Sequence, residues 1–366
     1  MISRIFEVVE RDMKNLLWDR NALADEKGRT FYFDNAKFVL IFFVVLAHLF
    51  GALRSSDVPV VSIFSTGVWS YFNTFHMAAF IFISGYFAKN FMKKGFSVQK
   101  PATYFFIYLA AQIVFIVCEK YIWSSPDKIA WTIFKAQGSL WFMQCMVIWY
   151  LLIPMLDQFK PKYIIPGAIL LGIFVGYDIR VNDYLSFSRV LVHLPFFMAG
   201  YYTDLKLIEK LKEKKFITFS WVVLIAVFVI DVLIGEKTPR GLLRCNTPYN
   251  DCGFDILPKS LWWVGRLAFY VVAFLLIASF LAVVPKFKTF FSKWGSRTLA
   301  VYLLHRLFFR SYETLGWYKY FNGSVLGMVA VFFIALALVL LLSLRPFSIP
   351  FDYLQKISIK KALKDR

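Results

Sequence analysis

Ten stretches of mostly apolar residues divide this chain, and they constrain its fold more than any other feature. A helix that crosses a bilayer needs about 20 mostly apolar residues. The ten stretches cover roughly residues 36–53, 69–88, 101–122, 139–157, 162–176, 188–204, 216–234, 262–283, 297–313 and 323–344. The fifth is short and contains Pro166, and the ninth contains His305 and Arg306. The sequence predicts an all-α polytopic integral membrane protein with about ten transmembrane helices.

The composition excludes several other classes of protein. Hydrophobic residues make up 59% of the 366 residues, charged residues make up 18%, and the mean hydropathy is +0.60. Soluble domains are usually about 45–50% apolar and about 25% charged. A disordered chain, a coiled coil and an ordinary soluble enzyme are therefore excluded.

The net charge of +19 is explained by where the basic residues lie. The loops after the second, fourth, sixth and eighth stretches, together with the C-terminal tail, carry about twice as many Lys and Arg as the other loops. Cytoplasmic loops of membrane proteins are enriched in Lys and Arg. We therefore expect both termini in the cytoplasm and need no nucleic-acid partner. A multi-pass protein of the cell membrane follows, with a bacterial inner membrane as the expected location.

The chain divides into three predicted parts. Residues 1–33 form a cytoplasmic amphipathic segment, residues 34–344 the membrane domain, and residues 345–366 a basic cytoplasmic tail. The segment from Met1 to Asp19 places apolar residues on one helical face and charges on the other, which is typical of an interfacial helix. A helix that caps the domain in solution is the alternative. No cleavable signal peptide is expected, because the first apolar stretch follows this polar segment.

All four histidines of the chain lie inside predicted membrane helices. They are His48, His76, His193 and His305. An ionisable residue within a membrane is a functional candidate, and a hydrogen bond between helices is the alternative. At 1.5 Å per residue, the first three share a level in the half away from the cytoplasm, and His305 lies closer to the cytoplasm. Neutral imidazole suits a general base, a transient acyl carrier or a proton relay in a transporter.

The spacing of the cysteines favours a local disulfide rather than a metal site. Cys245 and Cys252 lie in the longest loop on the outer side, and their spacing permits a disulfide in an oxidising compartment. Two free thiols are the alternative. No Cys/His spacing suits a metal ion, so none is expected.

Five motifs follow one another along residues 33–310. Ten residues separate Lys37 from His48. The motifs are Phe33-Asp34-Asn35-Ala36-Lys37 with His48, Phe75-His76-Met77 continuing to Ser84-Gly85-Tyr86, Ser139-Leu140-Trp141-Phe142, His193-Leu194-Pro195 continuing to Gly200-Tyr201, and Ser296-Arg297 continuing to Tyr302 and His305. In this order they resemble the acyltransferase-3 family of membrane O-acyltransferases, in the fucose 4-O-acetylase-like branch without a fused soluble domain. Two positions depart from the pattern, because Lys37 replaces the usual Arg and Ala78 replaces a Pro.

The resemblance implies an activity. It implies transfer of an acyl group, commonly acetyl, from cytoplasmic acetyl-CoA or another acyl-CoA to a hydroxyl of an envelope carbohydrate or glycolipid. The catalytic candidates are His48 and His76. The candidates for binding coenzyme A are Lys37, Lys93, Lys94, Lys100 and Arg297, and those for binding the acceptor are Trp141, His193 and His305.

Two other classes of function stay open on the sequence. One is a secondary transporter or permease for a sugar or a lipid-linked sugar, although no internal repeat of the kind common in transporters is found. The other is a scramblase or a structural partner in an envelope-synthesis complex. The acceptor, its hydroxyl position and the oligomeric state are open as well.

Overall fold

The computed structural model describes residues 31–92, 97–124, 129, 131–254 and 258–356. The predicted interfacial helix from Met1 to Asp19 and the two lysines Lys93 and Lys94 lie outside these residues. The division into three parts at residues 33 and 344 stays a prediction.

Within the described residues, ten long helices match the ten apolar stretches one for one. They are α2 (Phe31–Leu53), α3 (Pro59–Met92), α4 (Gln99–Tyr121), α5 (Trp141–Leu156), α6 (Pro161–Phe174), α7 (Phe187–Tyr202), α9 (Lys214–Ile234), α11 (Trp262–Val283), α13 (Thr298–Thr314) and α14 (Val325–Leu342). The shorter α-helices in this part of the chain are α8 (Leu205–Leu211), α10 (Arg240–Arg244), α12 (Ser292–Gly295) and α15 (Arg345–Lys356). The described residues form no strand beyond one isolated bridge between Lys135 and Tyr184. The predicted all-α fold is confirmed.

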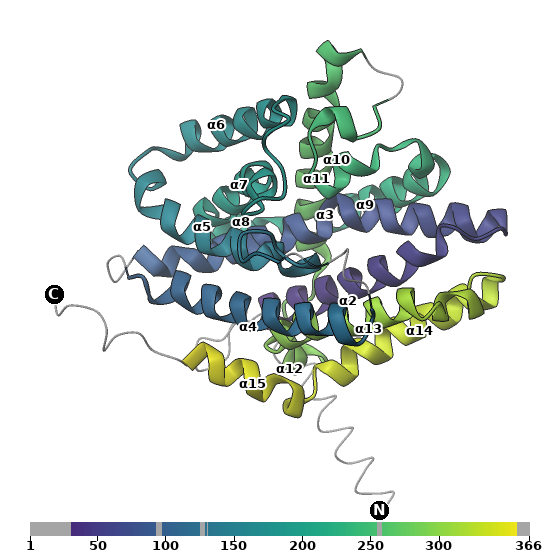
Figure 1. Cartoon of the computed structure of the whole chain (residues 1–366). Coiled ribbons are helices and arrows are strands. Elements are labelled where there is room, and N and C mark those ends of the chain that lie inside the picture. Colours follow the sequence, from purple (N-terminus) through teal and green to yellow (C-terminus); the bar gives the residue numbers. More distant parts are fainter. Residues whose placement is uncertain (1–30, 93–96, 125–128, 130, 255–257, 357–366) are drawn as a thin grey trace, which may run out of the picture.

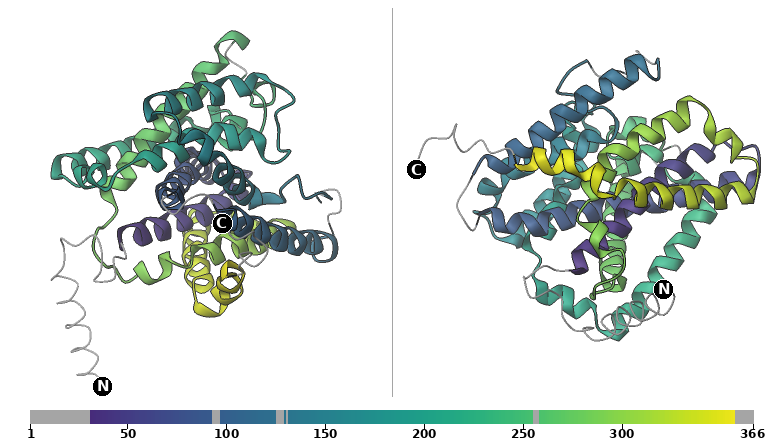
Figure 2. Two further views of the ribbon diagram at one scale, coloured as in Figure 1. Left: turned by 90° about the vertical axis from the view of Figure 1, so that its left-hand side faces the viewer. Right: turned by 90° about the horizontal axis from the view of Figure 1, so that it is seen from below.

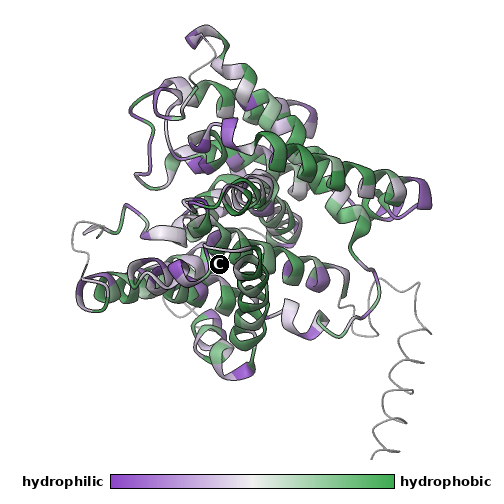
Figure 3. Ribbon diagram, turned by 90° about the vertical axis from the view of Figure 1, so that its right-hand side faces the viewer, coloured by the Kyte–Doolittle hydropathy of each residue, from purple (hydrophilic) through white to green (hydrophobic). Residues whose placement is uncertain are grey.

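Several helices have the length and hydropathy of membrane spans. Six segments are long and apolar enough to cross a bilayer, and they contain α2, α4, α5, α9, α11 and α14. Figure 3 shows these long helices as mainly hydrophobic, with hydrophilic residues gathered toward helix ends and loops. The chain is therefore a polytopic membrane protein, and ten crossings stay a prediction.

Helices α2 and α3 lie in the middle of the bundle (Figures 1 and 2). On one side α3 packs against α7, α9 and α11, and on the other side α2 packs against α12, α13 and α14. A short loop joins α2 to α3, so the two helices are antiparallel. We call the end of the bundle where α2 begins the Lys37 end, and the end where α2 passes into α3 the Arg54 end.

Two glycines let the backbones of α3 and α7 touch. A Cβ atom on Gly85 would lie 2.0 Å from the carbonyl oxygen of Phe197, and one on Gly200 would lie 1.8 Å from that of Phe82. Small residues allow this close approach between membrane helices. The glycines of the two Gly-Tyr motifs, at Gly85-Tyr86 and Gly200-Tyr201, thus have a packing role.

Gly200→Ala is expected to lower the stability of the protein by about 1–3 kcal/mol, the usual cost of overpacking. The added methyl group would force α3 and α7 apart. Gly167→Ala is the matched control, because Gly167 is also helical and no atom lies within 4 Å of a Cβ placed there. Thermal unfolding of both variants in detergent tests this, and an unchanged midpoint for Gly200→Ala would contradict the packing role.

Candidate active site

Two of the four histidines face each other between α2 and α13. The rings of His48 and His305 lie 5.2 Å apart, and the ring of Phe309 lies 4.8 Å from His48. His305 is fully buried, whereas His48 is half-buried. From its position along the helix, His48 was expected to share a level with His76 and His193 instead. The depth of a residue in the membrane does not tell in which direction its side chain points around the helix axis. That direction decides which histidine rings lie next to each other.

The hydrogen bonds of His305 favour one tautomer. Its Nδ1 atom lies 2.9 Å from the carbonyl oxygen of Val301, so Nδ1 carries the proton in this assignment. Its Nε2 atom is buried and has no hydrogen-bond partner among the described residues. An acceptor nitrogen without a partner thus lies beside His48.

His76 and His193 have structural contacts of their own. The Nδ1 atom of His76 bonds to the carbonyl oxygen of Phe72, one turn earlier in α3. His193 stacks on Trp141 with ring centroids 5.4 Å apart and an interplanar angle of 22°. The Arg189 guanidinium carbon lies 5.0 Å from the same Trp141 ring. Trp141, predicted to bind the acceptor, therefore packs against helix α7.

The segment before α5 fits closely against α13. Gly138 has a left-handed φ of +58°, and a Cβ there would lie 2.5 Å from Nε of Arg306. The hydroxyl of Tyr302 donates to the carbonyl oxygen of Ser139. The Ser139–Phe142 motif is thereby fixed beside the residues that flank His305.

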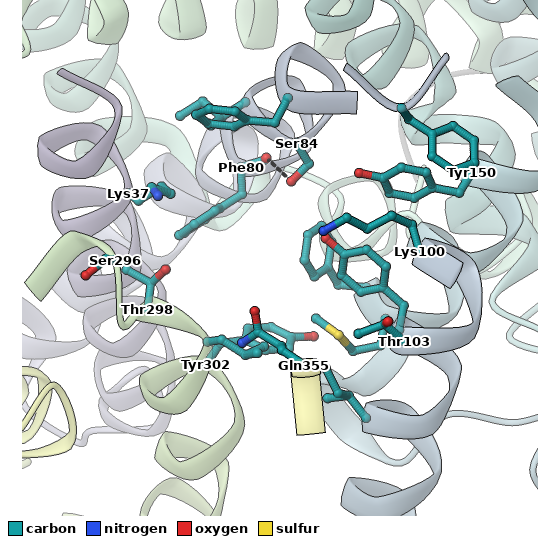
Figure 4. Close-up of a pocket in the computed structure, with 18 of the residues that line it drawn as sticks. Lys37, Phe80, Ser84, Lys100, Thr103, Tyr150, Ser296, Thr298, Tyr302 and Gln355 are labelled. Carbon is teal, nitrogen blue, oxygen red and sulfur yellow. Dashed lines mark hydrogen bonds between the residues drawn. The ribbon is translucent and has the colours of Figure 1, made fainter. Parts of the chain in front are cut away.

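A pocket of about 610 Å³ opens at the Lys37 end. Figure 4 shows Lys37 and Lys100 on opposite sides of it, with Tyr302 and Gln355 along another edge. Its walls combine hydroxyl, amide and aromatic groups from α2, α3, α4, α5, α13 and α15, including Ser84, Asn90, Thr103, Tyr104, Tyr150, Ser296 and Thr298. Two cations and many neutral hydrogen-bonding groups make it suited to an anionic ligand with a long apolar or amide-containing arm.

One lining residue of the pocket, Tyr302, lies next to His305 of the histidine pair. Met77, Phe142 and Tyr302 line this pocket, and the Tyr302 ring lies 6.3 Å from that of His305. In the part of the chain that the structure describes, no histidine lines the pocket itself. Tyr302 therefore borders the pocket on one side and contacts the histidine pair on the other.

Hydrogen bonds and an ion pair fix the position of Lys37. The Lys37 Nζ atom lies 2.9 Å from an oxygen of Asp34, and the lysine is about a quarter exposed. The side chain of the next residue, Asn35, makes four hydrogen bonds of 2.6–2.9 Å to the segment 285–292. The start of α2 is thus fixed to the segment that leads into α13, which supplies the opposite wall of the pocket.

The other basic residues predicted to bind coenzyme A do not all lie at the pocket. Lys100 lines the pocket together with Lys37. Arg297 does not, because its Nη1 atom donates to the carbonyl oxygen of Ser343 at 3.1 Å. That hydrogen bond turns the guanidinium toward the end of α14. Lys93 and Lys94 fall outside the described residues.

A buried ion pair joins α4 to α13 and was not singled out by the sequence. Arg310 donates to both carboxylate oxygens of Glu119, at 2.9 and 3.1 Å, and both side chains are almost completely buried. Gln137 donates to the same carboxylate at 3.3 Å. The pair therefore supports the segment that ends at Gly138. A carboxylate inside a predicted membrane helix was the available signal.

The predicted disulfide is not formed. Cys245 and Cys252 are both buried free thiols. The Sγ atom of Cys245 lies 3.2 Å from Nη1 of Arg266, and that of Cys252 lies 3.6 Å from the Thr247 hydroxyl. The spacing permitted a bridge, but the fold turns Cys245 toward a buried guanidinium instead.

A family model described as an acyltransferase domain, of the acyltransferase-3 type, matches residues 30–344. No curated protein and no solved structure matches the chain. The matched residues include all four histidines and both cations of the pocket.

Proposed function

The chain belongs to the acyltransferase-3 family and is a membrane acyltransferase, and on this premise we propose that it transfers an acetyl group from acetyl-CoA to a hydroxyl of an envelope carbohydrate or glycolipid. One observation carries the proposal. The pocket that contains Lys37 and Lys100 borders, through Tyr302, the pair formed by His48 and His305. A donor site and a candidate base are therefore neighbours. The narrower likeness to the fucose 4-O-acetylase-like branch stays a prediction.

The chemistry of the pocket suits coenzyme A. Its phosphates would pair with Lys37 and Lys100, because ammonium groups bind phosphate as point charges. The pantetheine arm, with its two amides, would lie along the hydroxyl and aromatic groups toward Tyr302. The positive-inside rule puts the Lys37 end in the cytoplasm, where coenzyme A is found. The side chain of Tyr302 must then move to admit the thioester.

His48 would act on the acceptor hydroxyl. It removes the hydroxyl proton while the oxygen attacks the thioester carbonyl carbon. The C–O bond forms, the C–S bond breaks, and the proton passes from His48 to the departing sulfur. The neighbouring His305, held by Val301, would orient the His48 ring, and His76 would position the acceptor.

Direct transfer can be separated from an acyl-histidine route. Labelled acetyl-CoA is mixed with the purified chain without acceptor, and the protein is quenched at early times. Direct transfer predicts no label on the protein. Label on wild-type protein that is absent from His48→Ala would assign the acyl-carrier route instead.

A solute-transport assay tests the alternative class. Proteoliposomes that contain the chain are expected to consume acetyl-CoA and to move no sugar when acetyl-CoA is absent. Movement of sugar without acetyl-CoA, together with no thioester cleavage, would support a permease and reject the proposal.

Lys37→Ala is expected to raise KM for acetyl-CoA about 10-fold or more with a smaller change in kcat. A hydrogen bond to a charged group contributes about 1.5–3 kcal/mol, and the lost interaction lies far from the thioester. Lys210→Ala is the matched control, because Lys210 is exposed on α8 and does not line the pocket. Steady-state kinetics of both variants give the answer.

Lys37→Arg separates binding from folding, because Lys37→Ala also leaves Asp34 without this partner. The arginine keeps the charge and restores the residue usual in the family, so we expect a KM near that of the wild type. An unchanged KM in Lys37→Ala would remove Lys37 from the donor site.

A further inference from the structure

Four arginines gather near the Arg54 end of the bundle. The guanidinium carbons of Arg54 and Arg244 lie 4.3 and 5.8 Å from the ring of Trp69. The charges of Arg240 and Arg244 both act on Arg54. Arg306 follows His305 directly on α13 and packs against Gly138. We call Arg54, Arg240, Arg244 and Arg306 the arginine cluster.

The cluster lies beside the candidate base. A Cβ on Gly51 would lie 3.2 Å from the Trp69 ring, so Trp69 packs on α2 at this position. Gly51 is three residues after His48, on the same side of the helix and about one turn away. The charges of Arg244 and Arg306 act on His48 as well. The cluster therefore lies close to His48, on the side toward the Arg54 end.

The positive charges of the cluster are not balanced within the described part of the protein. No carboxylate there lies within 4.0 Å of any of its four guanidinium groups, whereas Arg189, Arg180 and Arg310 all have carboxylate partners. The charge of Glu313 acts on the cluster, but its carboxylate lies nearest to Arg310, at 3.8 Å.

Among these four residues, Arg54 gives the clearest evidence of an unsatisfied side chain. Its Nη1 atom is buried and has no hydrogen-bond partner among the described residues. Burial, followed by the neighbouring charges of Arg240 and Arg244, lowers the pKa of Arg54 to about 10. Leaving a buried donor without a partner is unfavourable, and more so when the group is charged. An anion bound here would remove this cost.

We infer that the acceptor carries an oxyanion, a phosphate or a carboxylate, which binds to the arginine cluster while the hydroxyl to be acetylated lies one helical turn deeper, at His48. This inference rests on the proposed function and names the class of its acceptor. The residue type supports it, because the guanidinium fork matches the two oxygens of such groups. The location supports it too, because loops on the outer side normally contain few basic residues.

Sugar probes that differ only in charge test the inference. The purified full chain in nanodiscs of neutral lipid is titrated with methyl glucuronide, glucose 1-phosphate and uncharged methyl glucoside, and calorimetry measures binding. We expect both anionic probes to bind at least 10-fold more tightly than methyl glucoside. Arg54→Gln and Arg244→Gln should lose this preference, and Arg54→Lys should keep part of it.

Arg180→Gln is the matched control for charge. Arg180 is exposed in the loop after α6 and pairs only with Asp178, so its removal should leave the preference unchanged. Size-exclusion profiles confirm that each variant is folded. Equal binding of charged and neutral sugars by the wild type would overturn the inference, and so would an equal loss in Arg180→Gln.

Two further measurements separate related explanations. Nanodiscs with phosphatidylglycerol show whether a lipid headgroup competes for the cluster; competition without any preference among the sugars would assign the cluster to lipid and overturn the inference. Acetyl-CoA hydrolysis that depends on His48 is measured on the same samples. If hydrolysis occurs but no preference for anionic sugars is found, this inference alone fails. If hydrolysis is absent, the proposed function fails, whatever the sugars do.

Discussion

His48→Ala is expected to reduce acetyl transfer by about 10²–10⁴-fold, the usual contribution of a general base. The reason is geometric, since His48 is the less buried member of the His48–His305 pair beside the donor pocket. The KM for acetyl-CoA should change little, because His48 does not line that pocket. Transfer of labelled acetyl groups to the acceptor, or slow hydrolysis of acetyl-CoA without it, measures the effect.

Two variants show whether the loss is specific. His305→Ala should cause a smaller loss, because His305 acts through His48. His193→Ala should cause a still smaller one, because that ring stacks on Trp141 rather than on either ring of the pair. Binding of acetyl-CoA by His48→Ala shows that the protein is folded. Near-normal transfer by folded His48→Ala protein would remove His48 from the reaction.

The number and order of the long helices in the described residues were predictable because hydropathy is read along the chain. The start of α3 was not, because α3 begins at Pro59 and the apolar stretch was expected to begin at residue 69. Each apolar stretch became one helix, including the weak stretch at 297–313, which is α13. One of the basic residues of α13 is accommodated because Arg310 pairs with Glu119. A sum of hydropathy values contains no information about such partners.

The roles of the candidate site residues stay predictions, and the pairing of the histidines was not predictable from the sequence. Lys37 and Lys100 do line one pocket, and His48 does lie near it. However, His305 was expected to bind the acceptor at a different depth from His48, and the two rings are instead neighbours. Which faces of α2 and α13 meet is set by tertiary packing, which a single sequence does not reveal.

The same limit explains why the arginine cluster was not found from the sequence. Arg54 follows α2, Arg240 and Arg244 belong to α10, and Arg306 lies in α13. In the loops these residues looked like the small minority of basic residues expected on the outer side. Only the fold brings two of them to one indole ring, that of Trp69.

Glu119→Ala is expected to destabilise the protein by about 3–5 kcal/mol, because it leaves the charge of Arg310 buried without its main partner. The effect should exceed that of Gly200→Ala. The substitution should also disturb the candidate active site, because Glu119 accepts a hydrogen bond from Gln137. Gln137 precedes Gly138, which packs against Arg306. Thermal unfolding in detergent and the folded fraction after purification measure it.

A double replacement tests whether the loss of stability comes from an unpaired buried charge or from lost side-chain packing. Glu119→Leu combined with Arg310→Met removes both charges and keeps much of the volume, and such replacements of a buried pair are often neutral. We therefore expect the double variant to recover most of the stability that either single variant loses. Asp178→Ala is the matched control, because its pair with Arg180 is exposed to solvent and should contribute nothing measurable. If Glu119→Ala melts at the temperature of Asp178→Ala, the pair does not hold α4 against α13.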